Sequence, residues 1–365
     1  MNHSGHILII NPGSTSTKLA VYAYDVSSND LQVSNEVVLH HNQEQMASSG
    51  AVLEQLPLRL EALRDFLTSD DYNLELVMAR SAPLKPMRGG VYEVNESMLA
   101  DLRSAKYSNH ASNLAALLGD EIRKEMNIPV YISDPITTDE LFEVARISGV
   151  PEIQRRSRSH ALNMKASTRK ICVRHNIPYE KSNWVVCHLG GGISVAAMQN
   201  GALVDVNDAL LGMGPFSPER AGALPISGLL DLAFSGDYDR SSLDEKLSRS
   251  SGLKGYLGTS DLKDVEKMIQ DGDERAELIY DAMIYQIAKE MGAMASVHSF
   301  QLNGFILTGG MAHSQRLCLA ISGRIKSVAD VYVEPGENEL QALAEAGLRI
   351  VRGEETIMVY SDREK

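Results

Sequence analysis

The same local plan occurs twice in this chain, about half of its length apart. Residues 7–25, ILIINPGSTSTKLAVYAYD, contain an apolar run, a polar turn with a glycine, and a second apolar run. Residues 184–201, WVVCHLGGGISVAAMQNG, repeat that order around three consecutive glycines. Two such hairpins at corresponding places predict a duplicated domain, with the two halves facing each other across a cleft. Two unrelated hairpins would give the same pattern, so that alternative stays open at this stage.

The remaining periodicity predicts an α/β fold. Apolar strand-like runs alternate with segments of helical period, and 365 residues are enough for two domains. Helices are expected after Ser112, from about Glu274 to Ser299, and over residues 339–353, where Gly353 ends the helix. The predicted strands are residues 7–10, 74–79, 128–132, 184–188, 193–198, 305–308 and 331–334.

Charge and cysteine content exclude several classes of function. The formal net charge is −13 and the basic residues are scattered, so we expect neither a nucleic-acid partner nor a membrane partner. Cys172, Cys187 and Cys318 lack the paired spacing of zinc or redox sites, and Cys187 is expected in the core. No signal peptide or span of about 20 apolar residues is visible, which predicts a cytoplasmic protein.

Three loops have the composition of phosphate-binding turns. NPGSTSTK (11–18) is not a Walker A loop, because it returns into a strand, but its amides, hydroxyls and ammonium group could bind phosphoryl oxygens. HLGGGIS (188–194) lets the backbone approach a ligand closely. FILTGGMAHS (305–314) ends a strand at two glycines, and a helix is expected to follow. Each loop alone could be a plain turn, but together they favour a nucleotide between the two halves.

Several motifs of the chain together resemble those of a known family. NPGSTSTK, HLGGGIS, GPFSPERAGALP, LTGGMAHS and PGENELQALAEAGLRI together resemble the butyrate kinase branch of the acetate kinase family, within the sugar kinase, Hsp70 and actin superfamily. The resemblance implies two ribonuclease H-like domains around a cleft. Residues 1–157 with 339–365 would form the first domain, and residues 158–338 would form the second, nucleotide-binding domain.

The resemblance also implies an activity. Such an enzyme phosphorylates a short-chain carboxylate, here butyrate, with ATP and Mg²⁺, and the reverse reaction makes ATP from ADP and the acyl phosphate. The acceptor is already anionic at neutral pH, so no strong general base is required. The physical problem is the repulsion between two anions, which arginine pairing and a metal ion relieve. The family further implies a homodimer or a larger homo-oligomer.

By resemblance, four residues carry the chemistry. Arg80 matches the arginine that pairs with the acceptor carboxylate, and Arg220 matches the one that neutralises charge in the transition state. Asp134 would orient the acceptor or the metal, and His160 would donate to the phosphoryl group in flight. A surface ion pair is the alternative for each arginine, and a helix N-cap is the alternative for Asp134.

The resemblance assigns the nucleotide and the metal to further residues. Asn11 and Glu339 match the metal-linked positions, although Glu339 could simply be a first-turn acid of its helix. Asp261 could equally be a helix N-cap, and His110 is a weaker candidate that a contact at a helix start would also explain. The residues matched to nucleotide binding are Asn11, Ser14, Ser16, Lys18, His188, Gly190, Gly191, Gly192, Asp261, Gly309 and Gly310.

Two departures from the family pattern bear on the acceptor. Ser81 and Ala82, followed by Pro83, stand where the family more usually has glycines after the arginine. LLGMGPF (210–216) has leucine and methionine where acidic residues are common, which would suit a longer or branched acyl chain; acetate and propionate remain alternatives. A nucleotide-binding protein without turnover is the rival from another class. The retention of both arginines, Asp134 and His160 argues against it.

Overall fold

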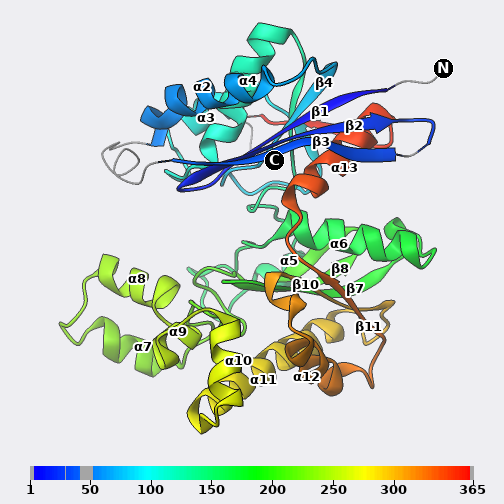
Figure 1. Ribbon diagram of the computed structural model, residues 1–365. Helices are drawn as coiled ribbons and strands as arrows, with labels where there is room; N and C mark the ends of the chain where they lie inside the picture. Colours follow the sequence, from blue (N-terminus) through cyan, green and yellow to red (C-terminus); the bar gives the residue numbers. More distant parts are fainter. Residues whose placement is uncertain (1–3, 29, 42–51, 362–365) are drawn as a thin grey trace. The chain divides into compact units, whose positions relative to one another are not determined.

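Two compact units make up the chain. The computed structural model describes residues 4–28, 30–41 and 52–361 (Figure 1). One unit comprises residues 1–138 and 338–365, and the other comprises residues 139–337. The chain therefore leaves the first unit once and returns to it for its last helix and strand.

The first unit is built on a seven-stranded mixed sheet in the order β12-β5-β6-β4-β1-β2-β3. The first three strands form an antiparallel meander, after which β4 runs parallel to β1 and β6 runs parallel to β4. The strands are β1 (Ser4–Pro12), β2 (Ser16–Asp25), β3 (Asp30–His40), β4 (Leu74–Ala79), β5 (Val91–Glu93), β6 (Val130–Ser133) and β12 (Ile357–Val359).

The second unit repeats that plan in a five-stranded sheet of order β11-β10-β7-β8-β9. Again three antiparallel strands are followed by two parallel ones. Its strands are β7 (Asn183–Leu189), β8 (Ile193–Gln199), β9 (Ala202–Val206), β10 (Gly304–Gly309) and β11 (Val331–Pro335). The shared order confirms the duplicated α/β domain that the two hairpins predict, and it agrees with the two ribonuclease H-like domains that the family resemblance implies. Each predicted strand is present.

Helices cover both faces of each sheet. In the first unit, α2 (Leu56–Leu67), α3 (Glu96–Arg103) and α4 (Asn113–Met126) pack with Leu8 and Ile10 of β1. The opposite face carries α13 (Glu339–Val351), whose Gly347 lies close to the side chain of Ile7. Successive residues of β1 thus alternate between two apolar layers, which explains why the strand reads as a continuous apolar run.

In the second unit, α6 (Ala161–Arg174) covers one face of the sheet, and α11 (Glu274–Val297) and α12 (Gln315–Ile325) cover the other. Met283, Ile287 and Met291 of α11 are fully buried, and so is Cys187. The remaining helices are α5 (Glu143–Arg146), α7 (Ile226–Ala233), α8 (Arg240–Arg249), α9 (Gly252–Leu257) and α10 (Leu262–Gln270), with short 3₁₀ turns η1 (Val52–Gln55), η2 (Tyr179–Lys181) and η3 (Gly310–His313).

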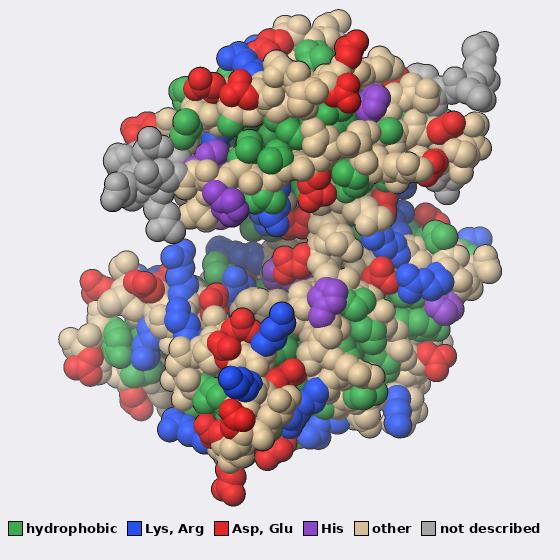
Figure 2. Space-filling model, in the orientation of Figure 1, with side chains coloured by type: hydrophobic (Ala, Val, Ile, Leu, Met, Phe, Trp, Pro, Cys, Tyr) green, Lys and Arg blue, Asp and Glu red, His purple; other side chains and the backbone are tan. Residues whose placement is uncertain are grey.

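The predicted helices are confirmed with small shifts at their ends. The helix after Ser112 is α4, and the longest helix is α11. The last helix, α13, stops at Val351, and Gly353 follows with φ +69°, the left-handed conformation that favours glycine after a helix. None of the helices in residues 4–28, 30–41 and 52–361 is long and apolar enough to cross a membrane. Figure 2 shows acidic and basic side chains interspersed over the face that it displays.

Candidate functional site

The first loop, residues 12–16, joins β1 to β2. The turn is closed by a hydrogen bond from the Gly13 N–H to the Ser16 carbonyl oxygen at 2.7 Å. Ser14 and Lys18 are exposed and Ser16 is partly exposed, so all three can meet a ligand. Thr17 differs, because its hydroxyl is buried and contacts Arg59 and His41. The composition of the loop suggested that all of its hydroxyl groups could bind a ligand. The structure shows instead that the Thr17 hydroxyl faces the protein interior.

Three predicted residues of the first unit form a closed triangle. The Asn11 amide nitrogen donates to Glu339 Oε2 at 2.9 Å, and its amide oxygen accepts from Arg80 Nη1 at 3.2 Å. Arg80 Nη2 lies 3.2 Å from Glu339 Oε1. Asn11 is buried, whereas the side chains of Arg80 and Glu339 are 30% and 28% exposed, so both remain accessible to a ligand.

Local structure explains how these residues meet. Asn11 lies on β1 beside β4, and the Arg80 N–H directly after β4 donates to the Ile10 carbonyl oxygen. Glu339 is the first residue of α13, which packs on the same sheet. The alternative of a first-turn helix acid is therefore correct for its position, and the same carboxylate also holds Asn11 and Arg80.

Asp134 follows β6 in an unusual backbone conformation, with φ +42°. Its carboxylate is buried and accepts from the Gly90 N–H at 2.7 Å and from the Ser133 hydroxyl at 3.1 Å. No helix begins at residues 137–141, since α5 starts at Glu143. The N-cap alternative for Asp134 is therefore wrong.

The second loop, Gly190–Gly192, joins β7 to β8 in the second unit. A Cβ at Gly192 would lie 2.1 Å from Arg220 Nη1, and a Cβ at Gly190 would lie 2.9 Å from His188 Nε2. Gly191 has only ordinary contacts. A Cβ at either glycine would therefore displace a charged or polar side chain that lies close to the loop backbone.

His160 and His188 stack beside this loop. Their ring centroids are 3.8 Å apart and the rings are inclined by 8°. Asn163 Nδ2 donates to the Gly336 carbonyl oxygen, so Asn163 Oδ1 is the acceptor for His188 Nδ1 at 2.7 Å. This network assigns the proton of His188 to Nδ1 and leaves Nε2, 3.4 Å from Glu337 Oε1, for a further partner.

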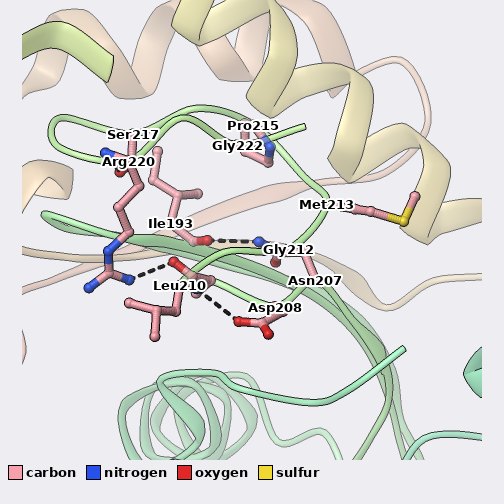
Figure 3. A pocket seen from close by; sticks show the side chains of 11 residues that line it. Ile193, Asn207, Asp208, Leu210, Gly212, Met213, Pro215, Ser217, Arg220 and Gly222 are labelled. Carbon is pink, nitrogen blue, oxygen red and sulfur yellow. Dashed lines mark hydrogen bonds between the residues drawn. The ribbon is translucent and has the colours of Figure 1, made fainter. Parts of the chain in front are cut away.

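Arg220, the second predicted arginine, is partly buried and borders a small pocket (Figure 3). Its Nη1 donates to the Ala209 carbonyl oxygen at 2.5 Å, and its buried Nε has no hydrogen-bond partner in the part of the chain that the structure describes. Burial lowers the pKa of Arg220, although nearby Glu219 and Asp208 oppose the shift. The guanidinium remains charged at neutral pH, because arginine is the most basic of the side chains.

Apolar side chains form part of the wall of this pocket. Ile193, Leu210, Met213 and Pro215 line it together with Asn207 and Asp208. Figure 3 shows the Arg220 guanidinium beside Leu210. The LLGMGPF segment therefore borders Arg220, and a few apolar side chains stand among the polar residues that line this pocket.

The remaining predicted residues lie apart from these clusters or have local roles. Asp261 caps α10 by accepting from the Lys263 N–H at 2.8 Å, which matches the N-cap alternative. Gly309 has φ +91° and lies against the Leu189 backbone, whereas η3 rather than an α-helix begins at Gly310. His110 accepts from the Ser112 N–H just before α4, as a contact at a helix start.

Sequence reasoning missed Arg59. This residue of α2 is fully buried, and its guanidinium donates to the backbone of the first loop. A signal was available, because Arg59 stands at helical spacing with Leu63 and Phe66 on the buried face of α2. Such an arginine usually extends its head to water, so the pattern alone did not distinguish a structural role.

Comparisons with known proteins identify the family and the fold of the chain. A family model described as the acetokinase family matches residues 152–359. Acetate kinase from Porphyromonas gingivalis is similar over 95% of this chain and 100% of its own, with a TM-score of 0.71 and 19% identity. Acetate kinase from Entamoeba histolytica is similar over 95% of this chain and 100% of its own, with a TM-score of 0.73 and 17% identity. A propionate kinase from Francisella tularensis subsp. tularensis is similar over 94% of this chain and 98% of its own, with a TM-score of 0.71 and 16% identity. At these identities the structures show a shared fold.

Proposed function

Because the chain belongs to the acetokinase family of phosphotransferases with a carboxyl acceptor, we propose that it is a butyrate kinase. ATP would be the phosphoryl donor, and the reaction would be the reversible formation of butyryl phosphate. The observation that supports the choice of butyrate is that the apolar residues Ile193, Leu210 and Met213 are among those that line the pocket beside Arg220. A chain of three carbons gains more from apolar surface than the single methyl group of acetate, at about 0.8 kcal/mol for each buried CH₂.

Arg80 is proposed to bind the acceptor carboxylate. Two of its guanidinium nitrogens contact Asn11 and Glu339, and the side chain is still 30% exposed. A guanidinium carries five N–H donors in a planar fork, so it can pair with a second carboxylate while keeping these contacts. Asn11 and Glu339 would thus orient Arg80 before the acceptor arrives.

Arg220 is proposed to neutralise the charge that develops on the transferred phosphoryl group. Its buried Nε lacks a partner among the described residues, and a buried donor without an acceptor is costly. Phosphoryl oxygens would satisfy this donor. Since charge-assisted hydrogen bonds are stronger where water is excluded, the contact would help most in the transition state.

The nucleotide phosphates are proposed to bind the first loop through Ser14, Ser16 and Lys18, and the glycines of the second loop would allow close backbone contact. His160 would donate to a phosphoryl oxygen from the ring nitrogen that its contact with Ser194 leaves available, and His188, which stacks on His160, would support the second loop. The acceptor needs no deprotonation, so none of these side chains has to act as a strong base.

Magnesium fits the oxygen donors of the first unit rather than a dedicated cage. The described residues include no group of three or more His, Cys, Asp or Glu side chains that could hold a metal ion. Mg²⁺ is usually bound by one or two carboxylates together with substrate phosphates. Glu339 offers such a carboxylate, and the Asn11 amide oxygen has a second lone pair beside its bond from Arg80. The ion would supply neutralisation of phosphate charge.

A panel of acids tests the choice of acceptor. Rates of ADP formation are measured with acetate, propionate, butyrate, isobutyrate and valerate, and kcat/KM is expected to be highest for butyrate. A preference for acetate over butyrate of about tenfold, or roughly 1.4 kcal/mol, would contradict the proposal. A preference for propionate or a branched acid would leave a carboxylate kinase with another acceptor.

A matched pair of variants tests these apolar lining residues. Leu210 lines the pocket and Leu224 does not, yet both are 38% exposed. Leu210→Gln should lower the ratio of kcat/KM for butyrate to that for acetate by about threefold or more, because apolar contact is lost. Leu224→Gln should leave the ratio unchanged. Equal ratios in both variants would remove Leu210 from acceptor selection.

A further inference from the structure

The buried guanidinium of Arg59 lies directly behind the first loop. Arg59 is fully buried, and it is held in α2, which packs against the meander. All five of its N–H donors are engaged, since Nε, Nη1 and Nη2 each make contacts between 2.8 and 3.3 Å. The acceptors are the carbonyl oxygens of Gly13, Ser14 and Ser16, the Thr17 hydroxyl and Gln55 Oε1.

These contacts fix the direction of the loop backbone. Arg59 donates hydrogen bonds to the carbonyl oxygens of Gly13, Ser14 and Ser16. The His41 N–H donates to the Thr15 carbonyl oxygen at 2.9 Å. Each of these four carbonyls therefore points to a protein donor. The N–H groups of Ser14 and Thr15 have no acceptor among residues 4–28, 30–41 and 52–361.

A turn with its carbonyls held on one side and N–H groups left on the other is suited to an anion. Ser14 and Thr15 are exposed, so a phosphate could reach these amides. The Lys18 side chain, which is also exposed, adds a positive charge near the same turn. The polarity of the loop thus depends on what holds its carbonyls from behind.

Lysine could not replace Arg59 in this arrangement. An ammonium group has three donors around one atom, whereas the guanidinium spreads five donors across a plane. The acceptors of Arg59 are three backbone carbonyls, the Thr17 hydroxyl and the Gln55 side chain, and they are spread over several residues. A lysine at residue 59 would therefore leave buried carbonyls without donors and release the turn.

We infer that Arg59 is a positioning residue for the nucleotide, which orients the first loop so that its outward N–H groups bind the triphosphate. This inference rests on the proposed kinase function, and it adds a residue that does not touch the substrate. Its specific consequence is a change in nucleotide affinity without a matching change in carboxylate affinity.

The test compares two variants of this cluster with a matched control. Arg59→Lys retains the charge, and Thr17→Val retains both the guanidinium and the β-branched shape, so the second variant folds even if the first does not. Arg64→Lys is the control, because Arg64 lies on the same helix but pairs with Glu125 at the surface. Isothermal titration calorimetry gives Kd for ATP, steady-state rates give KM for ATP and for butyrate, and Tm reports stability.

We expect Arg59→Lys to raise Kd and KM for ATP by about tenfold or more, since several charge-assisted contacts are lost. Thr17→Val should raise them by about threefold, because the Thr17 hydroxyl loses its contacts with Arg59 and His41. KM for butyrate should stay within about twofold in both variants, and Arg64→Lys should match the wild type.

Two results would overturn the inference while leaving the kinase function intact. One is an unchanged Kd for ATP in both variants. The other is a parallel rise of KM for both substrates together with a lower Tm, which is the signature of general destabilisation. Absence of ATP binding by the wild-type protein would instead contradict the proposed function, and the role of Arg59 would fall with it.

Discussion

The two hairpin loops occupy the same position in two sheets of the same order, yet they are held by different physical means. The first loop carries the side chains of Ser14, Thr15 and Ser16, and buried Arg59 donates hydrogen bonds to its backbone carbonyl oxygens. The second loop has no side chains, and Arg220 lies so close to Gly192 that a Cβ would not fit. Duplication therefore preserved the path of the backbone but not the chemistry that supports it.

The surroundings of the loops differ in the same sense. Beside the first loop, Asn11, Arg80 and Glu339 form an ionic triangle that is partly open to solvent. Beside the second, His160 and His188 stack within a buried network that includes Asn163. The proposed roles divide along these lines: the first unit would hold the acceptor carboxylate, the metal and the nucleotide phosphates of the first loop, and the second would contact the transferred phosphoryl group and the acyl chain.

The largest expected effect concerns Arg220. Arg220→Lys should lower kcat by about a hundredfold or more, because losing two charge-assisted hydrogen bonds costs roughly 3 kcal/mol or more. Kd for ATP should change little, since the contact is proposed to form mainly in the transition state. Arg249→Lys, an exposed arginine of α8, serves as the control. Normal turnover by Arg220→Lys would exclude the residue from the mechanism.

A smaller effect on kcat is expected when a glycine of each loop is replaced by alanine, and the two loops should respond differently. Gly192→Ala should lower kcat by about tenfold, because its Cβ would lie 2.1 Å from Arg220 Nη1 and displace the guanidinium. Gly13→Ala should keep kcat near the wild-type value, since its Cβ would meet only Ser16 at 3.6 Å. Initial rates at saturating substrates measure both. Equal losses in the two variants would contradict the distinction between the loops.

The smallest effect is a pH dependence confined to the first loop. Burial lowers the pKa of His41, and the nearby Arg59 charge lowers it further. The folded state therefore binds fewer protons than the unfolded state, so stability is fully present above the ordinary histidine pKa of about 6.5 and declines as the pH falls below it.

The corresponding measurement is Tm as a function of pH. His41→Gln should decline less than the wild type between about pH 7.5 and 5.5, by a degree or two. His313→Gln, which alters an exposed histidine, should follow the wild-type curve. Identical slopes for all three proteins would show that protonation of His41 does not destabilise the loop.

Much of the fold was predictable from local patterns. Apolar runs and helical periods located the strands and the helices α4, α11 and α13, and the repeated hairpin indicated the duplication. The inward direction of Thr17 was also predictable, because strand residues alternate between faces and Thr17 lies between Ser16 and Lys18. The hydroxyl composition of the run concealed that alternation.

The candidate site was less accessible to sequence reasoning, because its contacts are long-range. Asn11 and Glu339 are 328 residues apart, and only the return of α13 to the first sheet brings them together. Nor does any local pattern reveal that Arg220 lies against Gly192 or that Arg59 faces the carbonyls of the first loop. The family resemblance indicated Asn11, Glu339 and Arg220 as site residues, whereas only the three-dimensional structure revealed Arg59.

The most direct test of the proposed activity is to trap the product. The purified protein is incubated with ATP, Mg²⁺, butyrate and hydroxylamine, which converts an acyl phosphate into a stable hydroxamate. Butyryl hydroxamate should form in step with ADP, and it should be absent when butyrate is omitted or when Arg80→Ala replaces the wild type. ADP formation without hydroxamate, or no reaction with any short-chain acid, would contradict a carboxylate kinase.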